Sequence, residues 1–118
     1  MKVVIVGSAR ELRRKLFTWM PISVGDEVLE ASGMLSAAWY VDSCRPDLIV
    51  LDQSSCDARG VEMVNLFTQV APDVCVLVDE PEGGLELLVR DGGGDKLFAE
   101  SFYGRPFDFA AWRETGPP

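Results

Sequence analysis

The chain has no histidine, only three cysteines and no hydrophobic run long enough to cross a membrane. The lack of histidine excludes imidazole metal ligands and a histidine general base. The spacing of Cys44, Cys56 and Cys75 matches no zinc or redox motif, and such scattered thiols indicate a reducing compartment. We therefore predict a cytoplasmic protein that does not insert into a membrane and carries neither a resident metal ion nor a cofactor.

Positive charge is also scarce, because 11 Lys and Arg residues stand against 19 Asp and Glu residues and give a formal net charge of −8. A phosphate backbone or an anionic membrane surface repels such a chain, which argues against nucleic acid as a partner. Four basic residues do cluster, namely Arg10, Arg13, Arg14 and Lys15. Such a run is usually a solvated helix face, and a docking patch for an acidic partner is the less favoured interpretation.

The length of 118 residues fits one domain, and an apolar share of 47% is enough for a hydrophobic core. The chain closes on Gly116, Pro117 and Pro118, which continue no helix or strand. We predict a single domain over residues 1–113, with residues 114–118 as a tail or the start of a linker.

Short apolar runs alternate with helical patterns over the first two thirds of the chain. The strand-like runs cover residues 3–6, 27–31, 48–51 and 74–78. The helical patterns begin near Ser8, Met34 and Gly60. This alternation is typical of an α/β fold with a doubly wound parallel sheet, whose functional crevice lies at the carboxyl ends of the strands.

The pattern is weaker in the last third of the chain. We expect a short helix at 85–89 that the glycines of 92–94 interrupt, and a return to helical structure at 96–100. A brief fifth strand at 101–103 and a last helix at 107–112 complete the prediction. The sheet is thus predicted to have five parallel strands in the order 2-1-3-4-5, with helices on both faces.

Three segments carry a resemblance to a known family. The stretch from Arg45 to Asp52, RPDLIVLD, is followed by Gly60 and Glu62 eight and ten positions later, and Arg105 opens an Arg-Pro-Phe turn. This pattern resembles the CheY-like receiver domains of bacterial response regulators over essentially the whole chain. The resemblance implies a flavodoxin-like fold in which Asp52 occupies the position of the phosphoacceptor.

Several positions depart from the receiver pattern. Gly7 and Ser8 stand where a working receiver has two acids that help to hold magnesium, and Val78 stands where it has Thr or Ser. Arg105 replaces its lysine, and Phe102 takes the place of its switch aromatic. Phosphoryl transfer depends on a metal and a cation that neutralise charge, and magnesium requires several oxygen ligands. The resemblance is therefore to a degenerate, or pseudo-receiver, member of the family.

The leading hypothesis is a phosphorylation-independent protein-interaction module in bacterial signalling or regulation, without enzymatic activity. Its expected partner is a protein, and a second copy of the chain is one candidate. Trp39 and Tyr40 are adjacent on a predicted helix and cannot both face the core, so we expect one of them at a partner surface. We further predict that the Arg105 guanidinium lies within hydrogen-bonding reach of Asp52 or Ser8.

Two alternatives remain open from the sequence. The first is a weakly active receiver that is phosphorylated on Asp52 in a two-component phosphorelay. The second is a small flavodoxin-like ligand binder, in which the turn from Gly7 to Ala9 accepts an anion at the start of a helix.

Overall fold

The computed structural model describes residues 2–19, 25–53, 59–71, 74–80, 84–90 and 97–101. Its elements are, in chain order, β1 (Lys2–Val6), α1 (Ala9–Trp19), β2 (Glu27–Ala31), α2 (Met34–Cys44), β3 (Leu48–Asp52), α3 (Gly60–Phe67), β4 (Cys75–Asp79), β5 (Leu85–Arg90) and β6 (Leu97–Ser101). None of the helices in these segments is both long and apolar enough to cross a membrane.

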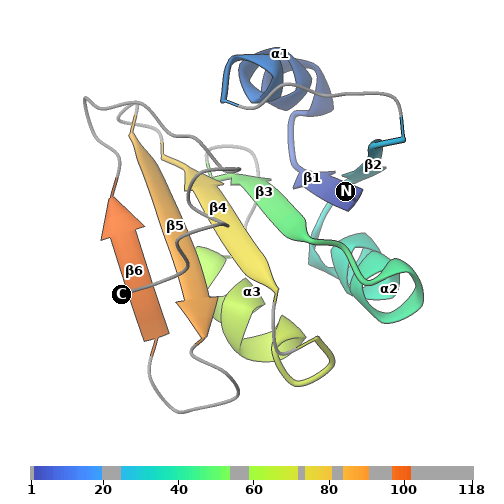
Figure 1. Ribbon diagram of the computed structural model, residues 1–118, viewed down its shortest axis with the longest axis vertical. Helices are drawn as coiled ribbons and strands as arrows, with labels where there is room; N and C mark the ends of the chain where they lie inside the picture. Colours follow the sequence, from blue (N-terminus) through green and yellow to red (C-terminus); the bar gives the residue numbers. More distant parts are fainter. Residues whose placement is uncertain are drawn as a thin grey trace.

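The strands form one six-stranded sheet in the order β2-β1-β3-β4-β5-β6. The first four strands pair in parallel, as expected for strands that are joined by helices. The last two pair antiparallel, β5 with β4 and β6 with β5 (Figure 1). The sheet is therefore mixed, with a parallel part that is followed by an antiparallel part.

The central strands form where β-branched and aliphatic residues are continuous. Every residue of β3 and β4 is buried, and β1 is buried from Val3 onward, which is typical of strands covered on both faces. The edge strand β2 is only partly buried, in keeping with its weaker sequence pattern. α2 ends at Cys44, and the next residue, Arg45, adopts a left-handed backbone with φ 51° before the buried Pro46.

Helices cover both faces of the sheet, as a doubly wound fold requires. On one face, Leu12 and Leu16 of α1 pack against alternate strand residues such as Val50 and Leu77. On the other face, α2 and α3 pack against the intervening residues, and Figure 1 shows both helices on the same side of the strands. The α/β class and the strand order 2-1-3-4-5 are therefore confirmed.

The prediction of five parallel strands is wrong in its last part. The segment predicted as a short helix at 85–89 is the strand β5, and residues 97–101, expected to be partly helical, are the strand β6. Both are antiparallel to their neighbours. Residues 91–96 and 102–118 lie outside the described segments, so the glycine interruption at 92–94, residues 102–103 of the expected last strand and the helix at 107–112 remain predictions.

The short link after β4 explains this difference. A parallel return needs a crossover of about a dozen residues or more, whereas residues 80–84 alone separate β4 from β5. The Glu80 N–H donates to the Gly84 carbonyl oxygen at 2.9 Å and closes the turn. Leu87 and Leu88 are both buried, one in each core layer, so their adjacent apolar side chains imitate the pattern of a helix. In such a short apolar run, the sequence pattern does not distinguish a strand that is buried on both faces from a short buried helix.

Candidate functional site

Two carboxylates lie side by side where β3 and β4 end. Asp52 and Asp79 are register partners on these parallel strands, and they are 8% and 6% exposed. By alternation they lie on the sheet face that α1 covers, together with Val50 and Leu77. Within the described segments, these two are the residues with polar or charged side chains that are buried. This carboxyl edge is where the sequence placed the candidate site around Asp52.

A lysine from α1 neutralises one member of this pair. The Lys15 Nζ lies 2.6 Å from Asp79 Oδ2 and donates a hydrogen bond to it. The Lys15 side chain is 41% exposed, whereas that of Asp79 is 8% exposed, so the carboxylate is the buried end of the ion pair. A charge-assisted bond of this length is strong, and it fastens α1 to the carboxyl end of β4.

Gln53 ties the end of β3 to its two neighbours. Its backbone N–H donates to the Asp79 carbonyl oxygen at 3.2 Å, and its side-chain Oε1 accepts from the Gly60 N–H at 3.3 Å. The second bond satisfies one of the free N–H groups at the start of α3. The edge is therefore braced by both strand and helix.

Gly7 and Ser8 form the turn from β1 into α1. Gly7 has φ 113°, a conformation that favours glycine, and its N–H donates to the Ala31 carbonyl oxygen at 3.2 Å. The Ser8 carbonyl oxygen accepts the first helical bond, from the Leu12 N–H at 3.0 Å. The turn thus has a backbone role, and its two residues bring no carboxylate to the edge.

Val78 does not lie beside Asp52, which corrects the placement made from the sequence. It belongs to the opposite core layer, with Leu51 and Val76, and is 1% exposed. A Cβ added to Gly60 would lie 2.4 Å from Val78 Cγ2, so α3 approaches β4 at this point as only a glycine allows. Asp79, one residue later, is the register partner of Asp52. The sequence interpretation was one position out of register.

Three other residues named from the sequence lie outside the described segments. They are Cys56, Phe102 and Arg105. The proposed ion pair between Arg105 and Asp52 therefore remains a prediction.

The basic cluster on α1 is largely paired within the chain. Arg13 Nε lies 2.6 Å from Glu30 Oε1, and Arg14 Nη2 lies 2.7 Å from Glu11 Oε2. The hydrogen bond from Arg14 is the main reason that the pKa of Glu11 lies below its ordinary value. With Lys15 bound to Asp79, three of the four cations already have an acidic partner. This supports a solvated, self-paired helix face over a docking patch for an acidic protein.

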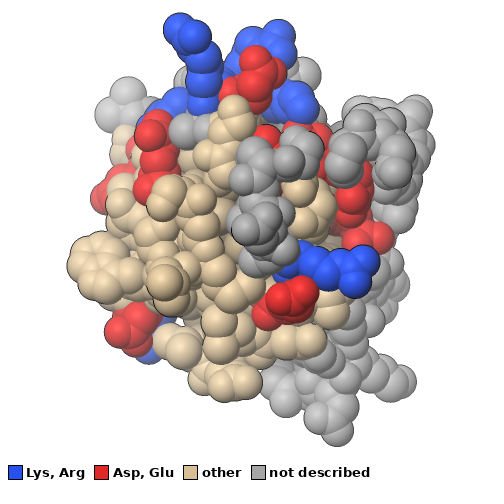
Figure 2. All heavy atoms as spheres, turned by 180° about the vertical axis from the view of Figure 1, so that it is seen from behind, with Lys and Arg blue, Asp and Glu red and all other residues tan. Residues whose placement is uncertain are grey.

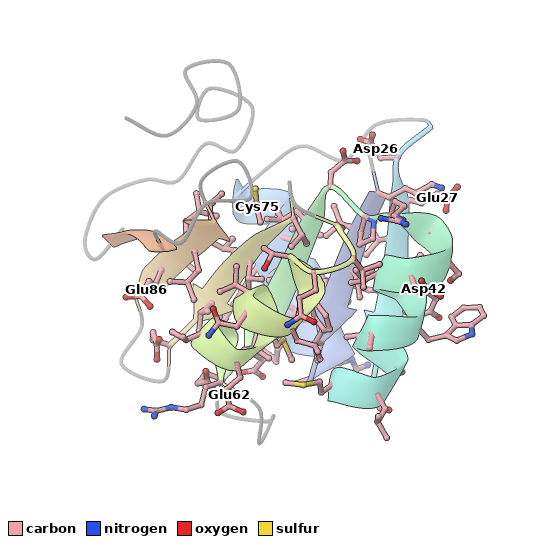
Figure 3. The ribbon with its side chains drawn as sticks, turned by 90° about the horizontal axis from the view of Figure 1, so that it is seen from below. Asp26, Glu27, Asp42, Glu62, Cys75 and Glu86 are labelled. Atoms are coloured by element: carbon pink, nitrogen blue, oxygen red, sulfur yellow. The ribbon has the colours of Figure 1, made fainter. Side chains whose placement is uncertain are left out.

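A hollow of about 480 Å³ opens beside the start of α3. It is lined by Gln53, Arg59, Gly60, Val61, Glu62, Val78, Glu80, Glu86 and Leu88. Three carboxylates against one guanidinium make this hollow unfavourable for an anion. Figure 3 shows Glu62 of α3 and Glu86 of β5 on this side of the molecule. The alternative of an anion-binding turn at Gly7 gains no support from it.

The donor set does not fit the magnesium ion that the receiver resemblance implies. Magnesium requires oxygen ligands in near-octahedral geometry. Asp79 is the second carboxylate beside Asp52, but Lys15 already neutralises it, and Gly7 and Ser8 supply no third. The described segments contain no group of three or more metal-ligating side chains.

Two members of this edge were missed from the sequence. Asp79 had a visible signal, because it follows the run 75–78 just as Asp52 follows 48–51, and equivalent strands end at one edge. Lys15 had none, because its contact with Asp79 spans 64 positions and depends on the packing of α1.

A second region is apolar and exposed, on the outer surfaces of α2 and α3. We call it the α2–α3 face, and its residues are Leu35 and Trp39 of α2, Leu66 of α3 and Val70 in the turn after α3. Leu35 is 89% exposed and Trp39 is 65% exposed, and the other two are each about two-fifths exposed. The expectation that Trp39 and Tyr40 cannot both be buried is confirmed, because Trp39 is largely exposed whereas Tyr40 packs partly against the core.

Comparison with known proteins adds no relative. No protein-family model matches the chain, and no curated protein has a significantly similar sequence. The functional argument therefore rests on the two regions described above.

Proposed function

We propose that this chain is a receiver-like protein-interaction module that binds a protein partner without phosphorylation of Asp52. The observation that carries the proposal is the α2–α3 face, a set of large apolar side chains left exposed on two neighbouring helices. The largest exposed apolar patch on a protein is often a binding surface.

The carboxyl edge supports the absence of phosphorylation chemistry. Asp52 is nearly buried, and its neighbour is a second carboxylate rather than a hydroxyl. Phosphoryl transfer to Asp52 would bring further negative charge next to Asp79, so it needs cations that neutralise both groups. Lys15, a cation at this edge, is already bound to Asp79.

The receiver resemblance supports a place in bacterial signalling or regulation. The part of the fold that agrees with it consists of three β-α units and the strand β4, which pair in the order β2-β1-β3-β4. The antiparallel β5 and β6 depart from it, so this module resembles receivers in its parallel half alone.

The proposal is tested by offering the chain a phosphoryl donor. The protein is incubated with magnesium and acetyl phosphate, and its intact mass is measured beside that of Asp52→Asn. In parallel, magnesium and beryllofluoride are titrated into ¹⁵N-labelled protein. We expect no phosphoryl adduct and no saturable shift at Asp52, Gln53 or Asp79.

A phosphoryl adduct that is absent from Asp52→Asn would overturn the proposal. It would establish the alternative of a weakly active receiver, in which Asp52 retains its role despite the changes at Gly7 and Ser8. Saturable beryllofluoride shifts centred on Asp52 would lead to the same conclusion.

A further inference from the structure

We infer that the partner of the α2–α3 face is a second copy of this chain, bound about a two-fold axis. This inference rests on the proposed function, because it names the occupant of the surface proposed there. Three features of the described residues carry it: the exposed area, the local charge and the rigidity of the aromatic anchor.

The exposed area matches what one side of a stable interface needs. The four side chains together expose on the order of 400 Å² of apolar surface, which is within the range of about 300–600 Å² for the largest patch on a typical monomer. A standard interface buries about 800 Å² on each partner, of which somewhat more than half is apolar. The α2–α3 face therefore supplies most of the apolar part of one such side.

The charge of this region is compatible with a copy of itself. The chain as a whole has a net charge of −8, which opposes self-association at most surfaces. Residues 34–45 and 59–71, which carry the α2–α3 face, contain two acids and two arginines, Asp42, Glu62, Arg45 and Arg59. Their charges cancel, so two copies that meet here do not bring like net charge together. A strongly basic partner is less favoured, because acidic residues do not outnumber basic residues in these two segments.

The arrangement of these charges can be followed in two views. Figure 2 shows the rear of the molecule, where a broad uncharged area is flanked by separate acidic and basic groups and the main basic cluster lies at the upper margin. Figure 3 places Asp42 on α2 and Glu62 on α3, with Cys75 across the sheet from α3. In a two-fold contact each surface meets its own copy, so the acids of one subunit can approach the arginines of the other.

Trp39 is a preorganised anchor for this contact. Its ring packs edge-on against Tyr40, with centroids 5.3 Å apart and an interplanar angle of 74°. Tyr40 in turn packs against the core layer under α2. A tryptophan held in one orientation loses little conformational entropy on binding, and tryptophan is among the residues that most often dominate interface energies. Leu35 lies one turn before it on the same helix and extends the apolar strip.

Sedimentation velocity over a concentration series tests the inference on the wild-type chain and two variants, Leu35→Lys and Trp39→Lys. We expect a reversible dimer with a micromolar dissociation constant for the wild type. Each variant is expected to raise that constant by about ten-fold or more, because it places an ammonium group inside an apolar contact. Both positions are largely exposed, so the variants should fold, and circular dichroism checks this.

The variants are chosen so that general charge repulsion cannot explain the result. Each makes the net charge less negative, which by itself favours association. Glu27→Gln is the matched control, because it changes the net charge by the same amount from an exposed position on β2, away from the α2–α3 face. We expect Glu27→Gln to dimerise as the wild type does or slightly more tightly.

Two outcomes overturn the inference. A wild-type chain that sediments as a monomer up to about 0.5 mM excludes a second copy as the partner at any affinity near the micromolar range. A dimer that Leu35→Lys and Trp39→Lys leave unchanged assigns self-association to another surface.

A second arm separates this inference from the proposed function. The same series is run with magnesium and beryllofluoride. A dimer of equal affinity in both arms supports both conclusions. If the dimer forms only when magnesium and the phosphoryl analogue are present, the partner is still a second copy, but binding is not independent of phosphorylation. A monomer in both arms refutes the second copy and leaves the proposed function standing.

Discussion

The carboxyl edge and the α2–α3 face differ in how completely their side chains are satisfied within the chain. At the edge, Asp79 is buried and already paired with Lys15, and Asp52 is 8% exposed beside it. On the face, Leu35 and Trp39 extend into solvent with little apolar cover. The region that resembles a chemical site is thus closed, whereas the region with no chemical motif is open for binding.

The comparison shows why a family resemblance and a structure can indicate different parts of one molecule. Motifs such as RPDLIVLD draw attention to Asp52, because its type and position are recognisable in the sequence. Exposure of an apolar side chain has no such motif, because it depends on which helix face the sheet leaves uncovered. The following substitutions separate the two regions, from the largest expected effect to the smallest.

Gly60→Ala should have the largest effect on stability, because it disrupts the packing of α3 against the sheet beneath the α2–α3 face. The new Cβ would lie 2.4 Å from Val78 Cγ2 and 3.0 Å from Leu88 Cδ1, so α3 has to move away from the sheet. We expect a loss of about 1–3 kcal/mol, as for overpacked cores. Urea unfolding measures it, with Gly33→Ala as the control, since a Cβ there meets nothing within 4 Å.

One outcome for Gly60→Ala would contradict this expectation. A midpoint that is unchanged, or no lower than that of Gly33→Ala, would show that α3 does not approach β4 so closely. The loss in a Gly60→Ala/Val78→Ala double variant should be smaller than the sum of the losses in the two single variants, because Val78→Ala removes the clashing methyl group.

Lys15→Met should destabilise the carboxyl edge by about 1–2 kcal/mol. It leaves the buried Asp79 carboxylate without its cation, and the partial exposure of Lys15 reduces the cost below that of a fully buried pair. A double-mutant cycle with Asp79→Asn isolates the interaction. If the two substitutions are additive in thermal unfolding, the ion pair contributes nothing and the edge is less closed than described.

Leu35→Lys should leave stability within about 0.5 kcal/mol of the wild type, since an 89% exposed side chain has little burial to lose. The result is read from chemical denaturation at a concentration where the chain is monomeric. A large loss of stability would mean that Leu35 is covered within the monomer, and the distinction between an open face and a closed edge would fail.

Glu11→Gln should have the smallest effect, and its size depends on pH. Arg14 lowers the pKa of Glu11 below its ordinary value of 4.5 in the folded chain, so the ion pair stabilises the fold above that pH and is lost as the pH falls through the lowered pKa. The variant should therefore melt on the order of one degree below the wild type at pH 7 and together with it at pH 2. A difference that grows on acidification would contradict this assignment.

The sequence predicted the parallel part of the fold well. Continuous aliphatic runs such as those in β1 and β3, separated by helical periodicity, leave few alternatives to a doubly wound sheet. Local signals also placed the start of α3 at Gly60 and the start of α2 at Met34. These features are encoded within short windows, so a single sequence reveals them.

The antiparallel part and the composition of the candidate site could not be predicted in the same way. Leu87 and Leu88 point into different core layers, and periodicity alone does not distinguish this from a buried helix. Whether Val78 or Asp79 lies beside Asp52 depends on a register shift of one residue, which reverses every side chain of a strand. The contact between Lys15 and Asp79 depends on the docking of α1, which no local pattern contains.

The most direct test compares Asp52→Asn with Leu35→Lys by sedimentation velocity at one concentration near the wild-type dissociation constant. Asn is close to Asp in shape but cannot accept a phosphoryl group. If binding occurs through the α2–α3 face without phosphorylation, Asp52→Asn dimerises with the wild-type affinity, whereas Leu35→Lys sediments as a monomer. Loss of the dimer in a folded Asp52→Asn variant, with Leu35→Lys still dimeric, would contradict the account.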